Sequence, residues 1–441
     1  MTRTTVVGGG LSGLVAAFSL ARRGETVRVL EASPRAGGVV RTEREEGFLL
    51  ELGPNTVRPT AEIRDLLGAL GLAPSALFAS PRLPRYIDFA GRLHALAPGP
   101  AALLTTRLLT WPGKLRLLRE PFVARGADSG ESAAAFFARR LGPEVAERVV
   151  APFVSGIWAG DAEALSAAAA FPVLTSWERD RGSLLRGALA ARKRGRPGEP
   201  LPRGLLSFRE GLETLPRAIA ERLGASLSLG VAATALSPAA DGWRIETSAG
   251  PIASDRVVVA TSASAAATLL EPVDREASRA LAEIPQPPLA VLHLAYPAAS
   301  FPAPLEGFGH LVVPAKDRRI LGAVWSSCLF PGRAPEGQVL LTAFAGGARD
   351  PDAAGLSDGD LLEIAGRELA ASLGTKPGGL PRLLRVTRHA RAIPQYTAGH
   401  AARLEALARA ERRLPGLHLL GNYRGGISVG DVVRNALAPL A

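Results

Sequence analysis

The sequence feature that most constrains the fold is a glycine-rich stretch near the N-terminus, TVVGGGLSGLVAAFSLARRGETVRVLE over residues 5–31. A β-branched run breaks at three glycines, and an apolar run with helical spacing follows. This pattern predicts a strand, a tight turn and a helix whose N-terminus offers N–H groups and a positive dipole end to a phosphate. A second strand then ends in Glu31, whose carboxylate stands where a ribose hydroxyl needs an acceptor. We therefore expect an α/β fold with a Rossmann-like, dinucleotide-binding domain.

The glycines of this stretch have different predicted tasks. Gly8 takes up the dihedral angles of the turn, Gly10 lets the backbone approach a pyrophosphate, and Gly13 lets the helix pack closely on the strand. A secretory signal peptide is the alternative, but the glycines interrupt its apolar segment and a second strand follows directly. The predicted dinucleotide contacts are Gly8, Gly10, Leu11, Ser12, Gly13, Glu31 and Ala32.

Composition narrows the class of protein. With 441 residues, 47% of them hydrophobic and 21% charged, the chain is long enough for roughly two or three globular domains. The net charge of +11 comes from arginine, because lysine occurs at only four positions. Compositional bias explains this charge best, while an anionic surface or a carboxylate substrate stays open. Nucleic-acid binding is disfavoured, since no basic stripe is interleaved with aromatic residues.

Cysteine usage and apolar runs bear on the compartment. Cys328 is the only cysteine, which predicts no disulfide framework and no thiolate-bound metal, and favours the cytoplasm. No apolar run approaches the roughly 18–20 residues needed to cross a bilayer, so we expect any membrane contact to be peripheral. Residues 101–122 are leucine-rich with interleaved basic residues, which suits two amphipathic helices that either belong to a core or face a membrane. A homodimer stays open.

A second glycine pair follows Glu31 in the segment SPRAGGVVRT, residues 33–42. Arg35 and Arg41 flank Gly37 and Gly38, and their guanidinium groups could reach phosphate oxygens. With this element the sequence resembles the FAD-dependent amine oxidase and protoporphyrinogen oxidase group, whose members carry an arginine and glycine-doublet element directly after the dinucleotide turn. The resemblance implies FAD as the cofactor. We expect the FAD to be bound without a covalent link, because neither a cysteine nor a suitably placed histidine accompanies the flavin segments.

The resemblance assigns further cofactor contacts to later segments. It places the loop after the strand at residues 46–51 near the flavin, and the backbone of Val231 at the adenine. The buried strand at residues 256–261 ends in small residues, as expected where a sheet meets a dinucleotide. Near the C-terminus, glycines beside a helix start would present N–H groups to the negative edge of the reduced flavin. The residues concerned are Gly53, Pro54, Asn55, Thr56, Val231, Ala260, Thr261, Gly421, Ile427, Ser428 and Val429.

Substrate contacts follow from the same resemblance. The segment PFVSGIWAGD, residues 152–161, matches a run of protoporphyrinogen oxidases in which a glycine, here Gly156, lets the substrate approach the flavin. A tight turn between buried helices is the simpler interpretation. Arg85 stands where such enzymes have an arginine that meets a substrate propionate, although a surface arginine is the simpler view. Three apolar residues on predicted strands either pack in the core or clamp one pyrrole ring, and these are Leu311, Val324 and Phe344.

The resemblance covers nearly the whole chain and implies its organisation. We expect an α/β (α+β overall) molecule with a Rossmann-like FAD-binding domain, a mixed-sheet substrate domain and an inserted helical domain that faces either the core or a membrane. The predicted ranges are 1–78, 206–268 and 386–441 for the first domain, 79–94 and 269–385 for the second, and 95–205 for the third.

The implied activity is oxidation of protoporphyrinogen IX to protoporphyrin IX in tetrapyrrole biosynthesis. Three hydride transfers to the flavin would be followed by reoxidation with O₂ and release of H₂O₂. Oxidation of coproporphyrinogen III, an amine oxidase-like activity and a non-catalytic carrier of the same fold are the alternatives. We expect at least about a tenfold preference for protoporphyrinogen, because the clamp is apolar, Arg85 is the only cation that can be placed, and burying an uncompensated carboxylate costs several kcal/mol.

Overall fold

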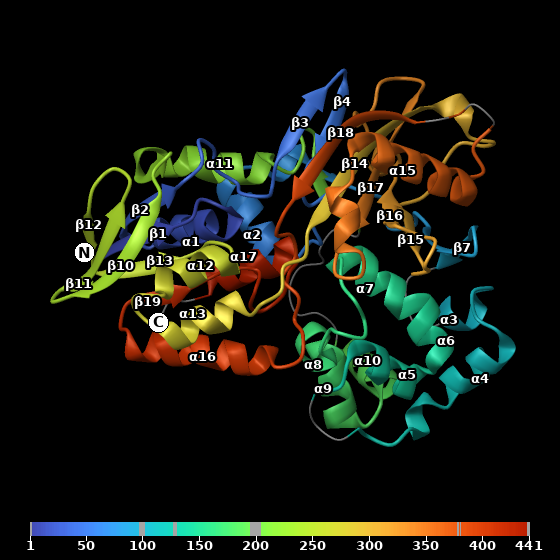
Figure 1. The fold of residues 1–441 in the computed structure, drawn as a ribbon, viewed down its shortest axis with the longest axis horizontal. Helices are drawn as coiled ribbons and strands as arrows, with labels where there is room; N and C mark the ends of the chain where they lie inside the picture. Colours follow the sequence, from blue (N-terminus) through green and yellow to red (C-terminus); the bar gives the residue numbers. More distant parts are fainter. Residues whose placement is uncertain are drawn as a thin grey trace.

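The computed structural model describes residues 2–96, 102–126, 130–194, 204–376, 379 and 381–438. These residues form a parallel-sheet lobe, an antiparallel-sheet lobe and a helical lobe (Figure 1). The architecture is mixed α/β, as the sequence predicts. The predicted domain boundaries at residues 78/79, 94/95, 205/206, 268/269 and 385/386 stay a prediction.

The parallel-sheet lobe is built on five strands in the order β19-β13-β1-β2-β9. All four neighbouring pairs run parallel. The strands at its centre are short apolar runs without alternation, because helices bury both faces of the sheet; Val6, Val29 and Val258, for example, are fully buried. The strands are β1 (Arg3–Val7), β2 (Thr26–Glu31), β9 (Leu227–Leu229), β13 (Arg256–Val259) and β19 (Leu417–Leu419).

Helices pack on the two faces of this sheet as two hydrophobic cores (Figure 1). One core holds α1 (Leu11–Arg22), α2 (Ala61–Leu70), α11 (Thr214–Leu223) and α17 (Val429–Leu437). The other holds α12 (Ala263–Leu270), α13 (Arg275–Ala282) and α16 (His400–Arg413). The three-stranded meander β10 (Ala233–Ala239), β11 (Gly242–Thr247) and β12 (Ile252–Ser254) packs against the second core.

The antiparallel-sheet lobe contains seven strands in the order β18-β14-β17-β16-β15-β6-β7, with one parallel pair between β15 and β6. The strands predicted within residues 289–344 are all present, and the predicted hairpin turns at Ala90 and Gly91, which both have positive φ. The strands are β6 (Arg85–Phe89), β7 (Arg92–Leu96), β14 (Leu289–Pro297), β15 (Gly309–Val312), β16 (Ile320–Val324), β17 (Gln338–Gly346) and β18 (Arg382–His389).

The two faces of the antiparallel sheet have different neighbours. Helix α15 (Asp358–Leu373) packs its apolar residues into the core on one face. Helix α7 (Ala151–Trp158) of the helical lobe approaches β15 and β16. The short helix α14 (Ser326–Leu329) follows β16 and contacts β17.

The helical lobe has its own core around Phe136, Phe137 and Trp158. Its elements are α3 (Ala102–Thr105), α4 (Trp111–Leu118), η2 (Glu120–Phe122), α5 (Ala133–Leu141), α6 (Pro143–Val145), the π-helical η3 (Ala146–Val150), α7, α8 (Ala167–Ala170), α9 (Pro172–Arg181) and α10 (Leu184–Arg194).

One sequence-based interpretation of this lobe is wrong. The segment 152–161, for which a tight turn was the simpler interpretation, is helical as far as Trp158. This helix continues η3 without a break, and the chain leaves it at Ala159 with φ of +47°.

Two further sheets have two strands each. The strand predicted at residues 46–51 is β4 (Phe48–Glu51), and it pairs with β3 (Thr42–Glu45), which the sequence analysis did not anticipate. β5 (Ala76–Phe78) pairs with β8 (Leu206–Phe208).

Candidate active site

The glycine turn between β1 and α1 has the close contacts that its sequence predicts. Gly8 has φ of +108°, a conformation that side chains disfavour, and a Cβ there would meet the Ala260 carbonyl oxygen at 2.7 Å. A Cβ on Gly13 would lie 2.0 Å from the Gly8 carbonyl oxygen. Only glycine therefore lets α1 begin so close to the turn. The turn also contacts the residues that end β13, Ala260 and Thr261.

The N-terminus of α1 is open toward an anion. Gly10 occupies the N-cap position without a side-chain hydrogen bond, and the first turn holds no acidic residue. Helices α2, α5, α12, α15 and α17, by contrast, are each capped by a serine or threonine side chain. Gly10 bridges to Gly37, and a Cβ on Gly10 would meet nothing nearer than Gly38 Cα at 4.0 Å. The glycine turn at Gly10 and the glycine pair at residues 37 and 38 thus lie beside uncapped N–H groups without side chains in the way. A pyrophosphate needs this arrangement.

The carboxylate of Glu31 is fixed beside this turn. It accepts hydrogen bonds from the N–H groups of Gly9 at 2.7 Å and Ser33 at 2.9 Å. A carboxylate has about four acceptor positions, so capacity remains for ribose hydroxyls. The N–H of Val231 donates to the Glu31 carbonyl oxygen at 2.9 Å, which leaves the Val231 carbonyl as the backbone group that it can offer an adenine.

The two arginines of the second glycine element have carboxylate partners in this structure. Arg35 lies 3.7 Å from Glu213 and also donates to the Gly38 carbonyl oxygen. Arg41 pairs with Glu43. A phosphate contact by either arginine would have to compete with these ion pairs, and both contacts stay predictions.

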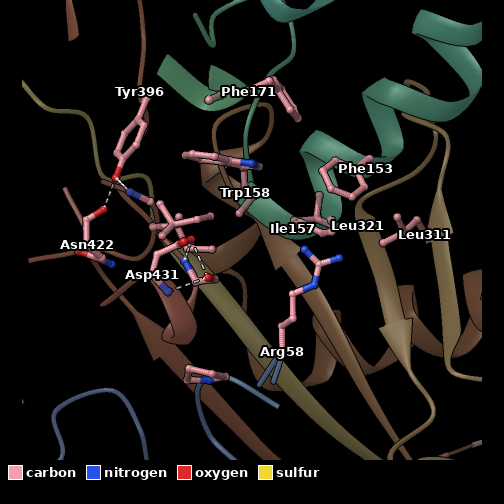
Figure 2. A pocket seen from close by; sticks show the side chains of 18 of the residues that line it. Arg58, Phe153, Ile157, Trp158, Phe171, Leu311, Leu321, Tyr396, Asn422 and Asp431 are labelled. Carbon is pink, nitrogen blue, oxygen red and sulfur yellow. Dashed lines mark hydrogen bonds between the residues drawn. The ribbon is translucent and has the colours of Figure 1, made fainter. Parts of the chain in front are cut away.

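A single cavity of about 1,770 Å³ lies where the three lobes meet (Figure 2). Its volume exceeds the roughly 300–1,000 Å³ typical of one small-molecule site. It reaches from the antiparallel sheet and α7 to the start of α17. The predicted site residues that line it are Gly53, Pro54, Asn55, Thr56, Arg85, Gly156, Leu311, Val324, Phe344, Ile427, Ser428 and Val429. The glycine turn, Glu31 and Val231 do not line it, and neither does Gly421, whose Cβ position is 2.3 Å from the ring of Tyr423.

The apolar wall of the cavity follows from strand register. Leu311 pairs with Gly322, and Gly322 pairs with Phe344, so the three form a row across β15, β16 and β17. Val324 follows Gly322 by two residues and therefore points to the same face. Because Gly322 has no side chain, this row leaves a gap between the side chains of Leu311 and Phe344. The three predicted clamp residues are thus brought together.

Gly156 has a structural task beside its predicted one. It lies in α7 where that helix meets β15, and a Cβ at this position would be 2.2 Å from Cδ2 of Leu311. The missing side chain therefore sets the position of Leu311 at the cavity wall. Phe153, Ile157 and Trp158 of the same helix also line the cavity (Figure 2).

Three arginines line the cavity, Arg58, Arg85 and Arg434, and the sequence analysis anticipated only Arg85. Arg85 at the start of β6 lies over the ring of Phe308, 5.2 Å from its centroid. Arg58, from the loop before α2, extends into the cavity in Figure 2. Burial, together with the nearby charge of Arg58, lowers the pKa of Arg85. Arg58 gives no motif signal, because only the fold brings its loop opposite β6.

An aromatic wall at the α17 end was also missed. The Tyr396 hydroxyl donates to the Asn422 carbonyl oxygen at 2.7 Å and accepts from the Gly426 N–H at 3.1 Å, which orients the loop before α17. The Tyr396 ring packs edge-on against Trp158 and stacks on His400, whose pKa burial lowers to about 4. The aromatic and histidine residues of PQYTAGH, 394–400, were the available signal.

The start of α17 faces the same cavity. Ser428 and Asp431 form a capping box, in which the Ser428 hydroxyl accepts from the Asp431 N–H at 3.1 Å. Asp431 is also paired with Arg434 at 2.7 Å. The two charged residues at this end of the cavity therefore neutralise each other, and Val429 brings the start of the helix to the cavity lining.

The class of protein follows from fold, glycine turn and cavity together. The chain matches the family model of flavin containing amine oxidoreductases over residues 11–438. It belongs to this family. It is therefore an oxidoreductase and a flavoprotein, and the FAD predicted from the sequence is confirmed.

Two relatives that match over nearly the whole chain are named protoporphyrinogen oxidase. The chain is 34% identical to the chloroplastic protoporphyrinogen oxidase of Oryza sativa subsp. japonica, over 98% of this chain and 86% of the relative. It is 36% identical to the protoporphyrinogen oxidase of Macaca fascicularis, over 99% of this chain and 97% of the relative. A crystal structure from Exiguobacterium sp. 255-15, provisionally named protoporphyrinogen oxidase, aligns with a TM-score of 0.82 at 26% identity, covering 99% and 97% of the two chains. The predicted resemblance is confirmed.

Proposed function

We propose that this protein oxidises protoporphyrinogen IX to protoporphyrin IX in tetrapyrrole biosynthesis. The observation that carries the proposal is the cavity itself. It joins an apolar, arginine-bearing wall of the antiparallel sheet to the N-terminus of α17. Protoporphyrinogen has a large apolar ring with two propionates on one edge, which matches that lining. The names of the relatives support the same substrate.

The residues present fit FAD. Gly8, Gly10 and Gly13 leave an uncapped helix start for the pyrophosphate, and Glu31 offers acceptors to a ribose. Val429 at the start of α17 offers its backbone N–H at the cavity. When bound, FAD supplies a two-electron acceptor for the hydride that leaves a bridging methylene carbon of the substrate.

The chain contributes position and water exclusion to this reaction. Leu311, Val324 and Phe344 hold the ring by apolar contact and keep water from it. No strong base is required, because the positive charge left by hydride loss is delocalised over two pyrroles. In keeping with this, Asp431 is the one carboxylate among the described residues of the cavity lining, and it is paired with Arg434.

The complete conversion removes three hydrides and three protons. Three O₂ then accept the six electrons and six protons and leave as three H₂O₂. The reaction class is an O₂-dependent oxidation.

Purified protein and anaerobically prepared porphyrinogens test the proposal. In air, added protein should convert protoporphyrinogen to the fluorescent porphyrin faster than buffer, with about three H₂O₂ per porphyrin. Coproporphyrinogen, assayed in parallel, should have a kcat/KM at least about tenfold lower. Absence of conversion by flavin-loaded protein would contradict the proposed function. Equal rates would mean that the cavity accepts four carboxylates.

We also propose that the helical lobe contacts a membrane surface peripherally. Trp111 and Leu115 of α4 and Phe122 of η2 are exposed by 77%, 59% and 85%, and α10, which contacts η2, adds exposed Leu185 and Leu189. Lys114 on α4 adds positive charge beside this patch. No helix within the described residues is long and apolar enough to span a bilayer.

Vesicle sedimentation tests the membrane contact. The protein should pellet with vesicles that contain anionic lipid, and the double variant Trp111→Ala/Phe122→Ala should pellet markedly less. Phe78→Ala, which removes an exposed aromatic ring outside the patch, serves as the control. Equal pelleting of all three proteins would contradict the assignment.

A further inference from the structure

The cavity holds two positive charges without a counter-charge. Among the described residues, Arg58 and Arg85 line it and form no ion pair, whereas its other two charged residues, Asp431 and Arg434, are paired with each other. Elsewhere in the described chain arginines commonly have carboxylate partners, as Arg35, Arg41 and Arg333 do. Two guanidinium groups without an ion pair among the described residues therefore line the same cavity.

Both arginines line the same cavity, and the side chain of Arg58 extends into it (Figure 2). Burial lowers the pKa of Arg85, and the charge of Arg58 adds to that effect. Holding like charges together costs free energy unless an anion joins them. They also come from different parts of the site, since Arg58 belongs to the loop that leads into α2 and Arg85 to the antiparallel sheet.

We propose that Arg58 is a second carboxylate-binding residue, so that Arg58 and Arg85 each bind one of the two propionates on the same edge of the substrate. This inference rests on the proposed function. Two arginines make the cavity specific for a ring with two neighbouring carboxylates. A single arginine would not distinguish a substrate with two carboxylates from a substrate with one. The presence of Arg58 also corrects the expectation that Arg85 is the only cation available.

A contact of Arg58 with the flavin is the competing explanation, because its loop passes near the start of α17. The Arg58 carbonyl oxygen lies 3.6 Å from the Cβ position of Gly430. The two explanations differ in what they require of the substrate. A carboxylate-binding arginine matters only for a substrate that carries free carboxylates, whereas a flavin-binding arginine matters for every substrate.

The experiment compares free-acid protoporphyrinogen with its dimethyl ester, using wild type, Arg58→Ala, Arg58→Lys and the control Arg82→Ala. Arg82 is exposed and does not line the cavity. Flavin content is measured for each variant, and Arg58→Gln replaces Arg58→Ala if the latter does not fold. Wild-type conversion of the free acid tests the proposed function separately.

We expect Arg58→Ala to raise KM for the free acid at least about tenfold, with kcat changed less than about twofold. With the dimethyl ester, wild type and Arg58→Ala should have the same kcat/KM within about twofold, since no carboxylate is left to bind. Arg58→Lys should recover part of the loss, and Arg82→Ala should behave as wild type. An unchanged KM for the free acid, or an equal loss with acid and ester, would overturn the proposal while leaving the proposed function intact.

Discussion

Arg85 lies on the face of Phe308, at 5.2 Å from the ring centroid, without a carboxylate partner in the described chain. We predict that Arg85→Ala lowers kcat/KM for protoporphyrinogen by roughly 1.5–3 kcal/mol of transition-state binding, the usual contribution of a hydrogen bond to a charged group. Flavin content should stay normal. A variant that loses FAD but turns over normally per bound flavin would show that Arg85 is structural.

Gly156 and Leu311 are coupled by the 2.2 Å approach between a Cβ at position 156 and Leu311 Cδ2. We predict that Gly156→Ala changes the free energy of unfolding by less than about 1 kcal/mol, because alanine favours the helix and the leucine tip can rotate away. The displaced leucine should raise KM for the porphyrinogen at least about fivefold. Adding Leu311→Ala should restore part of the loss. If the double variant is as impaired as the sum of both single changes, the contact between the two residues is not the cause.

At the scale of elements, α17 links helix capping to cofactor binding. Ser428→Ala removes the side-chain bond to the Asp431 N–H and should cost roughly 1 kcal/mol of stability. It should also weaken FAD binding, measured by titrating apoprotein, because the N–H groups of this helix start lose their orientation. Ser357→Ala removes the equivalent cap of α15, on the other side of the antiparallel sheet, and should cost similar stability without affecting FAD. Equal FAD affinities in both variants would contradict the link.

The elements that could be predicted are those whose signal is local. The glycine turn, β14 to β17 and the Ala90–Gly91 hairpin each carry their periodicity and turn residues in a short stretch. β3 and the helix over residues 151–158 have no such local signal and were not predicted. β3 is a charged four-residue strand that forms only by pairing with β4. The glycine within α7 predicts a turn from the sequence, and only the structure shows that its missing side chain makes room for Leu311. Arg58 joins the site through tertiary contacts alone, whereas the segment 394–400 offered a sequence signal for Tyr396.

For the whole molecule, three buried histidines predict acid lability. Burial lowers the pKa of His293, His310 and His400 to about 4 each, while unfolded histidine titrates near about 6.5. The folded state keeps these histidines neutral. Their contribution to the free energy of unfolding is therefore fully present above the pKa of the unfolded state, and it is lost as the pH decreases from about 6.5 to 4. Each histidine then costs up to roughly 3 kcal/mol. Glu51, whose pKa burial raises to about 7, acts in the opposite direction but is one group against three.

Urea unfolding at several pH values measures this dependence. The free energy of unfolding should fall steeply between about pH 6.5 and 4, and His293→Gln should reduce the slope in that interval. A flat profile, or the same slope in the variant, would show that these histidines take up protons in the folded state.

Anaerobic mixing of the flavin-loaded protein with protoporphyrinogen tests most directly whether the cavity brings this substrate to the cofactor. The visible flavin absorbance should bleach at a rate that saturates with substrate concentration, and admitting O₂ should restore it with formation of H₂O₂ and fluorescent porphyrin. An amine offered instead should leave the absorbance unchanged. Flavin that stays oxidised in the presence of protoporphyrinogen, or that bleaches only with an amine, would contradict the proposed function.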